Sequence, residues 1–144
     1  MLKAVIYSDG ASSGNPGPAG IGAVLNIGER KITISEPIGE ATNNIAEYKA
    51  LIKALKTALE HNVRGVSILL DSELIEKQIK GAYRVKNRGL MPLFAEVNNL
   101  LGKFQHYSIN HIPREKNKEA DALAKKAVKT AIINKGAGEM VAPD

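Results

Sequence analysis

Two aspartates of this chain stand directly after short apolar runs. Asp9 follows the run Lys3–Ser8, and Asp71 follows the run Val66–Leu70. Runs of this kind predict buried strands, and in an open α/β sheet ligands bind beyond the carboxyl ends of the strands. If the two strands are parallel neighbours, both carboxylates lie at one edge of the sheet. Taken singly, an aspartate in this position is often only a turn or cap residue.

Two further acids fall inside expected helices and among small residues. Glu47 lies in the first turn of a helix that begins near Ile45, and Asp121 lies in the first turn of a helix over Lys118–Ile133. Alanines flank both positions, which leaves room beside Glu47 and indicates a packed helix face around Asp121. An acid in a first helical turn also complements the helix dipole, so neither residue establishes a site alone.

Four converging carboxylates would have a defined chemistry. Two carboxylates about 4 Å apart repel by roughly 4 kcal/mol at an effective dielectric constant near 20, so such a cluster favours bound cations. Hard carboxylate oxygens select Mg²⁺ or Mn²⁺. Two such ions about 3.5–4 Å apart activate a water and stabilise the leaving alkoxide of an in-line phosphoryl displacement. That is phosphodiesterase chemistry, and it requires no nucleophilic side chain.

The elements that must position these acids follow from hydrophobic periodicity and turn residues. Short turns join the first three strands, which therefore form an antiparallel meander. A helix capped by Thr42 or Asn43 follows and ends at Asn62, and Ser72 caps a second, short helix. The expected strands are Lys3–Ser8, Ile21–Ile27, Lys31–Ile38, Val66–Leu70 and Tyr107–Ile112. This order predicts an α/β fold with one mixed sheet covered by helices.

Composition sets the broad class of the protein. The chain has 144 residues and no cysteine, which excludes disulfides, thiolate metal sites and cysteine nucleophiles. Its net charge of +5 suits a polyanionic partner, although a solvated basic surface gives the same value. No apolar run approaches the roughly 18 residues that span a bilayer, so we expect no membrane association and a cytoplasmic location. We expect one domain over residues 1–134 and a flexible tail over 135–144.

Local motifs around the four acids resemble those of the ribonucleases H of type 1. The resemblance runs from about Leu2 to about Lys129, with all four acids in the family's order. The segments that carry it are Tyr7–Ser12 with Gly14–Gly20, Thr42–Glu47, Leu70–Ser72, and His111–Glu115 with Asn117 and Ala120–Ala124. The first segment is specific to that family, and the four together are very specific.

The resemblance implies both a fold and a reaction. The fold is ribonuclease H-like, with a five-stranded mixed sheet flanked by helices. The reaction is endonucleolytic hydrolysis of the RNA strand of RNA–DNA hybrids, with 5′-phosphate and 3′-hydroxyl products. It uses two Mg²⁺ ions, and Mn²⁺ is expected to support it as well. The implied metal ligands are Asp9, Glu47, Asp71 and Asp121. We expect a monomer that needs no protein partner.

The resemblance also implies the residues that bind the hybrid. Asn15, Asn43 and Asn44 match minor-groove contacts that read the 2′-hydroxyl of RNA, the group that separates RNA from DNA. Thr42 matches a residue that holds a phosphate of the DNA strand, and Gly10 is counted with these binding positions.

Three departures from the family's pattern concern substrate recognition. Ile45 stands where many members have arginine, and Glu73 stands where many have glutamine. Because the arginine is absent at Ile45, double-stranded RNA is a candidate side substrate that should be tested. The connector over residues 81–89 is also too short for the basic protrusion of some bacterial members. We expect the cations of this connector to contact backbone phosphates instead, and they are Arg84, Lys86 and Arg88. The alternative is that the connector is only a solvated loop.

A turnover residue is expected near the fourth acid. Some relatives use a mobile histidine in that loop, and others use an arginine. We favour Arg114, which lies in the loop, over His111, which is placed on a strand and is more often structural there.

Three other function classes fit parts of this pattern. A different nuclease or an integrase core on the same fold would lack the paired asparagines, Asn43 and Asn44. A non-catalytic binding module would have lost one of the four acids. An ATPase of the actin-like superfold needs two lobes, for which 144 residues are too few. A hybrid endonuclease therefore remains the prediction.

Overall fold

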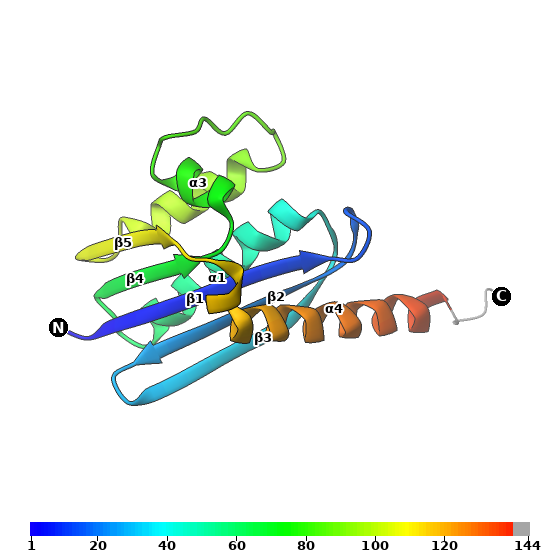
Figure 1. Cartoon of the computed structure of the whole chain (residues 1–144), viewed down its shortest axis with the longest axis horizontal. Helices are drawn as coiled ribbons and strands as arrows, with labels where there is room; N and C mark the ends of the chain where they lie inside the picture. Colours follow the sequence, from blue (N-terminus) through cyan, green and yellow to red (C-terminus); the bar gives the residue numbers. More distant parts are fainter. Residues whose placement is uncertain (140–144) are drawn as a thin grey trace.

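A computed structural model describes residues 1–139 of the chain (Figure 1). The element order is three strands, a long helix, a strand, two helices, a strand and a final helix. The bounds are β1 Lys3–Ser12, β2 Gly17–Ile27, β3 Arg30–Ala41, α1 Asn43–Glu60, β4 Gly65–Leu70, α2 Glu73–Ile79, α3 Met91–Leu101, β5 His106–His111 and α4 Lys118–Glu139, with a 3₁₀ turn at Arg114–Lys116.

The strands form one mixed sheet in the order β3-β2-β1-β4-β5. Adjacent strands β1, β2 and β3 pair antiparallel, whereas β4 lies parallel to β1 and β5 lies parallel to β4. The predicted meander and the predicted parallel pairing of the first and fourth strands are therefore confirmed. The central strand β1, drawn in blue in Figure 1, carries both kinds of pairing.

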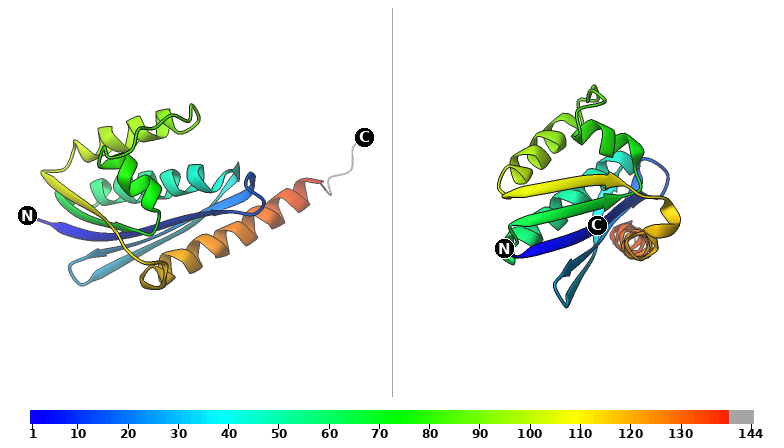
Figure 2. Two further views of the ribbon diagram at one scale, coloured as in Figure 1. Left: turned by 45° about the horizontal axis from the view of Figure 1, so that its top comes forward. Right: turned by 60° about the vertical axis from the view of Figure 1, so that its left-hand side comes forward.

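Helices cover the sheet from both sides. The left view of Figure 2 shows α1 and α3 on one side and α4 on the other. The main core lies between α1 and the sheet, where Ile6, Leu25, Leu51, Leu55 and Ile68 are completely buried. Burying an aliphatic side chain of this size contributes about 1.5–3 kcal/mol, so this layer supplies much of the stability.

Small residues allow α4 to lie directly on the opposite face. A Cβ atom on Gly22 would come within 2.3 Å of the Ala120 carbonyl oxygen, and one on Gly20 would come within 2.5 Å of the Ala127 side chain. The alanines of α4 that face the sheet are buried, as the packed face predicted around Asp121 requires. This close approach fixes where α4 begins, next to the end of β4.

Several element ends differ from those predicted. Strand β1 continues to Ser12 because its ladder with β2 runs on past the end of β4. Asp9 is therefore inside a strand and does not end it. Helix α1 begins at Asn43, which puts Glu47 beyond the first turn. Strand β5 spans His106–His111, one residue earlier than expected.

The last helix is longer than predicted. It continues to Glu139, so residues 135–139 are helical where a tail was expected. No proline lies in residues 134–139, and Lys135 of the added turn pairs with Glu40 at 3.0 Å. Residues 140–144 of the expected tail lie outside the described residues. Within the described part of the chain, no helix combines the length and apolarity needed to cross a membrane.

Candidate active site

The first two acids meet because one ladder ends before the other. Parallel pairing of β1 with β4 stops at Ser8 and Leu70. The next residues are Asp9, still paired with Gly22 of β2, and Asp71, the first residue after β4. The predicted juxtaposition of the two aspartates is present, although it arises inside β1 and at the end of only one strand.

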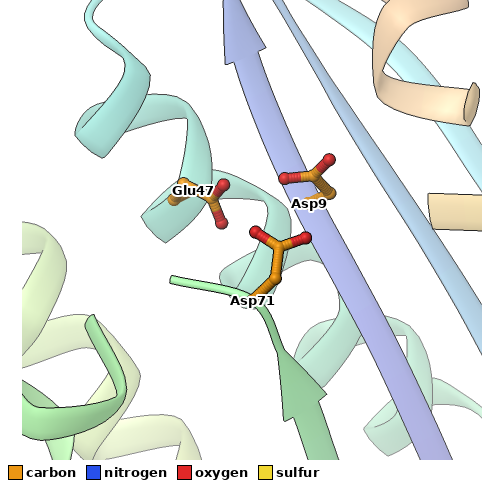
Figure 3. A group of neighbouring side chains, drawn as sticks. All are labelled: Asp9, Glu47 and Asp71. Carbon is orange, nitrogen blue, oxygen red and sulfur yellow. The ribbon is translucent and has the colours of Figure 1, made fainter. Parts of the chain in front are cut away.

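Glu47 reaches the same point from α1. Gly10 packs against the backbone of this helix, and a Cβ atom there would come within 2.2 Å of the Ala46 carbonyl carbon. Only glycine permits so close an approach, which brings the second turn of α1 down onto β1. Carboxylate oxygens of Asp9, Glu47 and Asp71 consequently lie within 4.8 Å of one another. Figure 3 shows the three side chains pointing toward one another from β1, α1 and the end of β4.

Burial makes this cluster costly without a cation. Asp9 is only 6% exposed. Burial, and next to it the charge of Asp71, raises the pKa of Asp9 to about 6, although a hydrogen bond with Glu47 opposes the shift. Burial also raises the pKa of Glu47 well above its ordinary value, and the neighbouring Asp9 carboxylate adds to the shift. Three hard oxygen donors held together against their repulsion fit a divalent metal such as Mg²⁺.

Asp121 lies beside this cluster but outside the group of three. It is close enough to Asp9 to raise the pKa of that residue, and its own carboxylate pairs with Lys125 at 2.9 Å. Burial acts to raise the pKa of Asp121, but the bond to Lys125 and the nearby Arg114 charge outweigh it and lower the pKa. The fourth acid therefore differs electrostatically from the other three.

Arg114 and His111 take different positions around the site. Arg114 is exposed in the 3₁₀ turn and near enough to act on Asp121, as the expected turnover residue would be. His111 is exposed at the end of the edge strand β5, where it pairs with Leu70. The role of either residue stays a prediction.

One residue of the site was missed as a site residue from the sequence. Asn117 is 1% exposed, and its side-chain NH₂ group donates to Asp71 Oδ2 and to the Ser8 carbonyl, both at 2.9 Å. The sequence signal was its place four residues before Asp121, which alone indicates only a helix cap.

The predicted binding residues gather at the start of α1. The Asn43 N–H donates to Asn15 Oδ1 at 2.8 Å, and Asn43 Oδ1 accepts from the Ser12 N–H at 2.9 Å. Both amides thus use their oxygens internally and keep their NH₂ groups as donors for a ligand. Thr42 caps the helix by accepting from the Ile45 N–H, which confirms the predicted cap.

A surface pocket of about 280 Å³ adds one more residue to this region. Asn15, Thr42 and Asn44 line it from the α1 side, and Asn87 lines it from the connector between α2 and α3. Asn87 was not singled out from the sequence, because nothing there shows that the connector folds back onto α1. Gly10, by contrast, is buried under α1, so its observed contribution is the close approach of helix and strand.

The basic connector is exposed as expected. Arg84, Lys86 and Arg88 all lie on its surface, and none of them makes an ion pair with a described residue. The loop projects away from the sheet between α2 and α3, at the top of Figure 1. These three cations are therefore free to meet a polyanion.

The sheet order and its acidic edge define a class of nucleic-acid-processing domain. The family described as "Reverse transcriptase-like" matches residues 7–127 of the chain. The chain is also 36% identical to Ribonuclease H of Phenylobacterium zucineum, an alignment that covers 94% of this chain and 97% of that protein. The chain thus belongs to the ribonuclease H family, whose members are metal-dependent enzymes.

Solved structures of the family have the same fold. The ribonuclease H domain of Rv2228c from Mycobacterium tuberculosis superimposes with a TM-score of 0.87 at 36% identity, covering 93% of this chain and 99% of that one. A compost ribonuclease H1, LC11, solved in complex with an RNA/DNA hybrid, gives a TM-score of 0.80 at 39% identity, covering 90% and 99%. The predicted fold class is confirmed. The chain spans 36% of the length of the whole bifunctional protein Rv2228c, to which it is 38% identical.

Proposed function

We propose that this protein is an endonuclease that hydrolyses the RNA strand of RNA–DNA hybrids and leaves 5′-phosphate and 3′-hydroxyl ends. The observation that carries the proposal is the convergence of Asp9, Glu47 and Asp71 where the β1–β4 ladder ends. Family membership and the hybrid-bound structure of LC11 support it. One chain supplies the complete acidic cluster, which supports action as a monomer.

Asp9, Glu47 and Asp71 would hold Mg²⁺, with Asp121 as a further ligand at the margin of the site, and Mn²⁺ would bind the same oxygens. Bound there, two such ions would supply an activated water and would neutralise charge on the leaving oxygen. The protein's contribution is to hold the carboxylates together in a partly buried cluster. Because the pKa values of Asp9 and Glu47 are raised, loss of protons accompanies metal binding.

The remaining polar residues would hold and orient the hybrid. The free NH₂ groups of Asn15 and Asn43 would donate to 2′-hydroxyl groups of the RNA strand. Thr42 and the connector cations would contact backbone phosphates, which fix register without reading sequence. Arg114, beside Asp121, would assist release of the charged product.

The test is a cleavage assay with end-labelled duplexes and single strands. We expect the RNA strand of the hybrid to be cut with Mg²⁺ or Mn²⁺ and left intact with chelator, with 5′-phosphate ends on the products. Duplex DNA should be uncut, and a double-stranded RNA arm tests the side activity raised by Ile45. An intact hybrid at every metal concentration, or cleavage of the DNA strand, would contradict the proposal.

A further inference from the structure

Asn117 occupies an unusual position for an asparagine that precedes a helix. Its backbone carbonyl accepts the Asp121 N–H at 3.0 Å, so it stands at the start of α4. An asparagine there ordinarily turns its side chain back to cap the helix. Here the side chain points away from α4 and donates to the Asp71 carboxylate and to the Ser8 carbonyl. A helix cap therefore does not explain this residue.

The orientation of the Asn117 amide is fixed by its partners. Both partners are acceptors, and the NH₂ group has two hydrogens, one for each. The opposite amide orientation would set Oδ1 against two other oxygens, without a donor among them. Oδ1 itself is buried with no protein donor in the described structure, so nothing pulls the amide the other way. The NH₂ group is thus committed to Asp71 and Ser8.

This contact fixes how the Asp71 carboxylate is presented. Asp71 follows the last residue of β4, so the strand ladder no longer holds it. Asn117 engages its Oδ2 atom, and no described residue hydrogen-bonds Oδ1, which remains available to a ligand. Through the Ser8 carbonyl, the same amide ties Asp71 to β1 immediately before Asp9.

We propose that Asn117 is a positioning residue for the metal site, which orients Asp71 relative to Asp9 and the start of α4. This inference rests on the proposed metal-dependent function. Partners that orient metal ligands typically contribute 10–100-fold to metal affinity or activity. Loss of Asn117 should therefore raise the Mg²⁺ requirement while leaving the affinity for the hybrid almost unchanged.

The test compares Asn117→Ala, Asn117→Ser and Asn117→Gln with the unmodified protein, and uses Asn110→Ala on the exposed face of β5 as a matched control. The serine hydroxyl is one bond shorter than the asparagine NH₂ group and carries a single hydrogen, so it cannot bridge Ser8 and Asp71. Glutamine keeps the NH₂ donor. Two readouts are needed: the Mg²⁺ concentration for half-maximal hybrid cleavage, with kcat and KM separated, and the Mg²⁺-induced shift in melting temperature measured without substrate.

We expect the alanine and serine variants to need roughly 10-fold more Mg²⁺ or above, with an unchanged KM for the hybrid and a smaller Mg²⁺-induced melting shift. Glutamine should restore part of both readouts, and Asn110→Ala should behave as the parent. If the alanine variant does not fold, the serine and glutamine variants decide whether Asn117 positions Asp71 or has only a structural role. A serine variant with the parental Mg²⁺ requirement would overturn the inference, whereas a parent that shows no Mg²⁺-dependent cleavage would overturn the proposed function itself.

Discussion

At the scale of single residues, the four acids are not equivalent. Asp9, Glu47 and Asp71 share one cluster, in which Asp9 is buried and the other two are half-buried, whereas Asp121 stands beside it and pairs with Lys125. A ligand at the margin of a metal site is more easily replaced by water than one at its centre. Asp121→Asn should therefore lose less activity than Asp9→Asn, above all in Mn²⁺. Initial rates of hybrid cleavage across a Mn²⁺ titration measure the difference, and equal losses in both variants would contradict it.

The raised pKa of Asp9 predicts how stability depends on pH. Its pKa rises from 3.8 to about 6 on folding, so the folded state binds more protons between these values. Stability from this group is then fully present below pH 3.8 and is lost as the pH rises through about 6. Without metal, Asp9→Asn should remove this loss of stability, because asparagine does not ionise. Asparagine also keeps a side-chain oxygen that can accept from the Gly10 N–H, so the substitution preserves that hydrogen bond.

Thermal melts in chelator check this expectation. At pH 7.5 Asp9→Asn should exceed the parent by about 1 kcal/mol, which corresponds to roughly 2–4 °C for a domain of this size. The difference should vanish near pH 4. Mg²⁺ should stabilise the parent more than the variant at the higher pH, since it binds only the folded state. A variant that melts below the parent in chelator at pH 7.5 would show that Asp9 is chiefly a structural residue.

The sequence identifies the acids better than the residues that support them. Acids after apolar strands are visible as a pattern, and the motif match adds their order. Asn117 could not be assigned, because a helix cap and a contact with Asp71 look the same in the sequence and only the fold brings Ser8 and Asp71 to it. The separation of Asp121 from the other three acids also depends on Lys125, one turn along α4.

At the scale of elements, Gly10 sets the distance between α1 and β1. A methyl group there would overlap the Ala46 backbone, so α1 would have to move outward. Gly10→Ala should destabilise the protein by about 1–3 kcal/mol, as overpacking of a core does, and should displace Glu47 from the cluster. Denaturant melts and cleavage rates measure the two effects. Gly102→Ala, whose added methyl meets only ordinary contacts, is the control, and equal behaviour of both variants would contradict this account.

The connector between α2 and α3 is expected to act through charge alone. Replacing Arg84, Lys86 and Arg88 by alanine should weaken binding of the hybrid and flatten its dependence on salt. Each lost phosphate contact changes the slope of log K against log salt by roughly 0.9 for a B-like duplex. Binding to a non-cleavable hybrid at several salt concentrations gives this slope. An unchanged slope would mean that the connector is only a solvated surface.

Element types were predictable, and their ends were less so. Apolar runs and turn residues placed all five strands and the long helices, since periodicity reports burial directly. The extensions of β1 to Ser12 and of β3 to Ala41 have no such signal, because their pairing depends on the partner strand and not on local composition. The helical turn after Ile133 was not predicted, because the residues that follow were expected to form a tail.

At the scale of the whole molecule, the fold explains why the site lies where it does. A sheet that changes from antiparallel to parallel pairing at β1 leaves one ladder shorter than its neighbour. The carboxylates lie where the shorter ladder ends. Helix α1 packs over this point on one face of the sheet, and α4 begins beside it on the other (Figures 1 and 2). The sheet and α1 therefore supply the three acids of the cluster, and α4 supplies Asp121 beside it.

The most direct test of this account is the single-turnover rate of hybrid cleavage by Asp71→Asn at saturating Mg²⁺. Asp71 belongs to the central cluster, and its replacement keeps the size of the side chain. Removing one electrostatic contribution to a transition state typically costs 10²–10³ in rate, so the variant should lose at least about 100-fold. Glu60→Gln, an exposed acid at the end of α1, should keep the parental rate. Near-parental cleavage by a folded Asp71→Asn protein would contradict the assignment of this cluster as the active site.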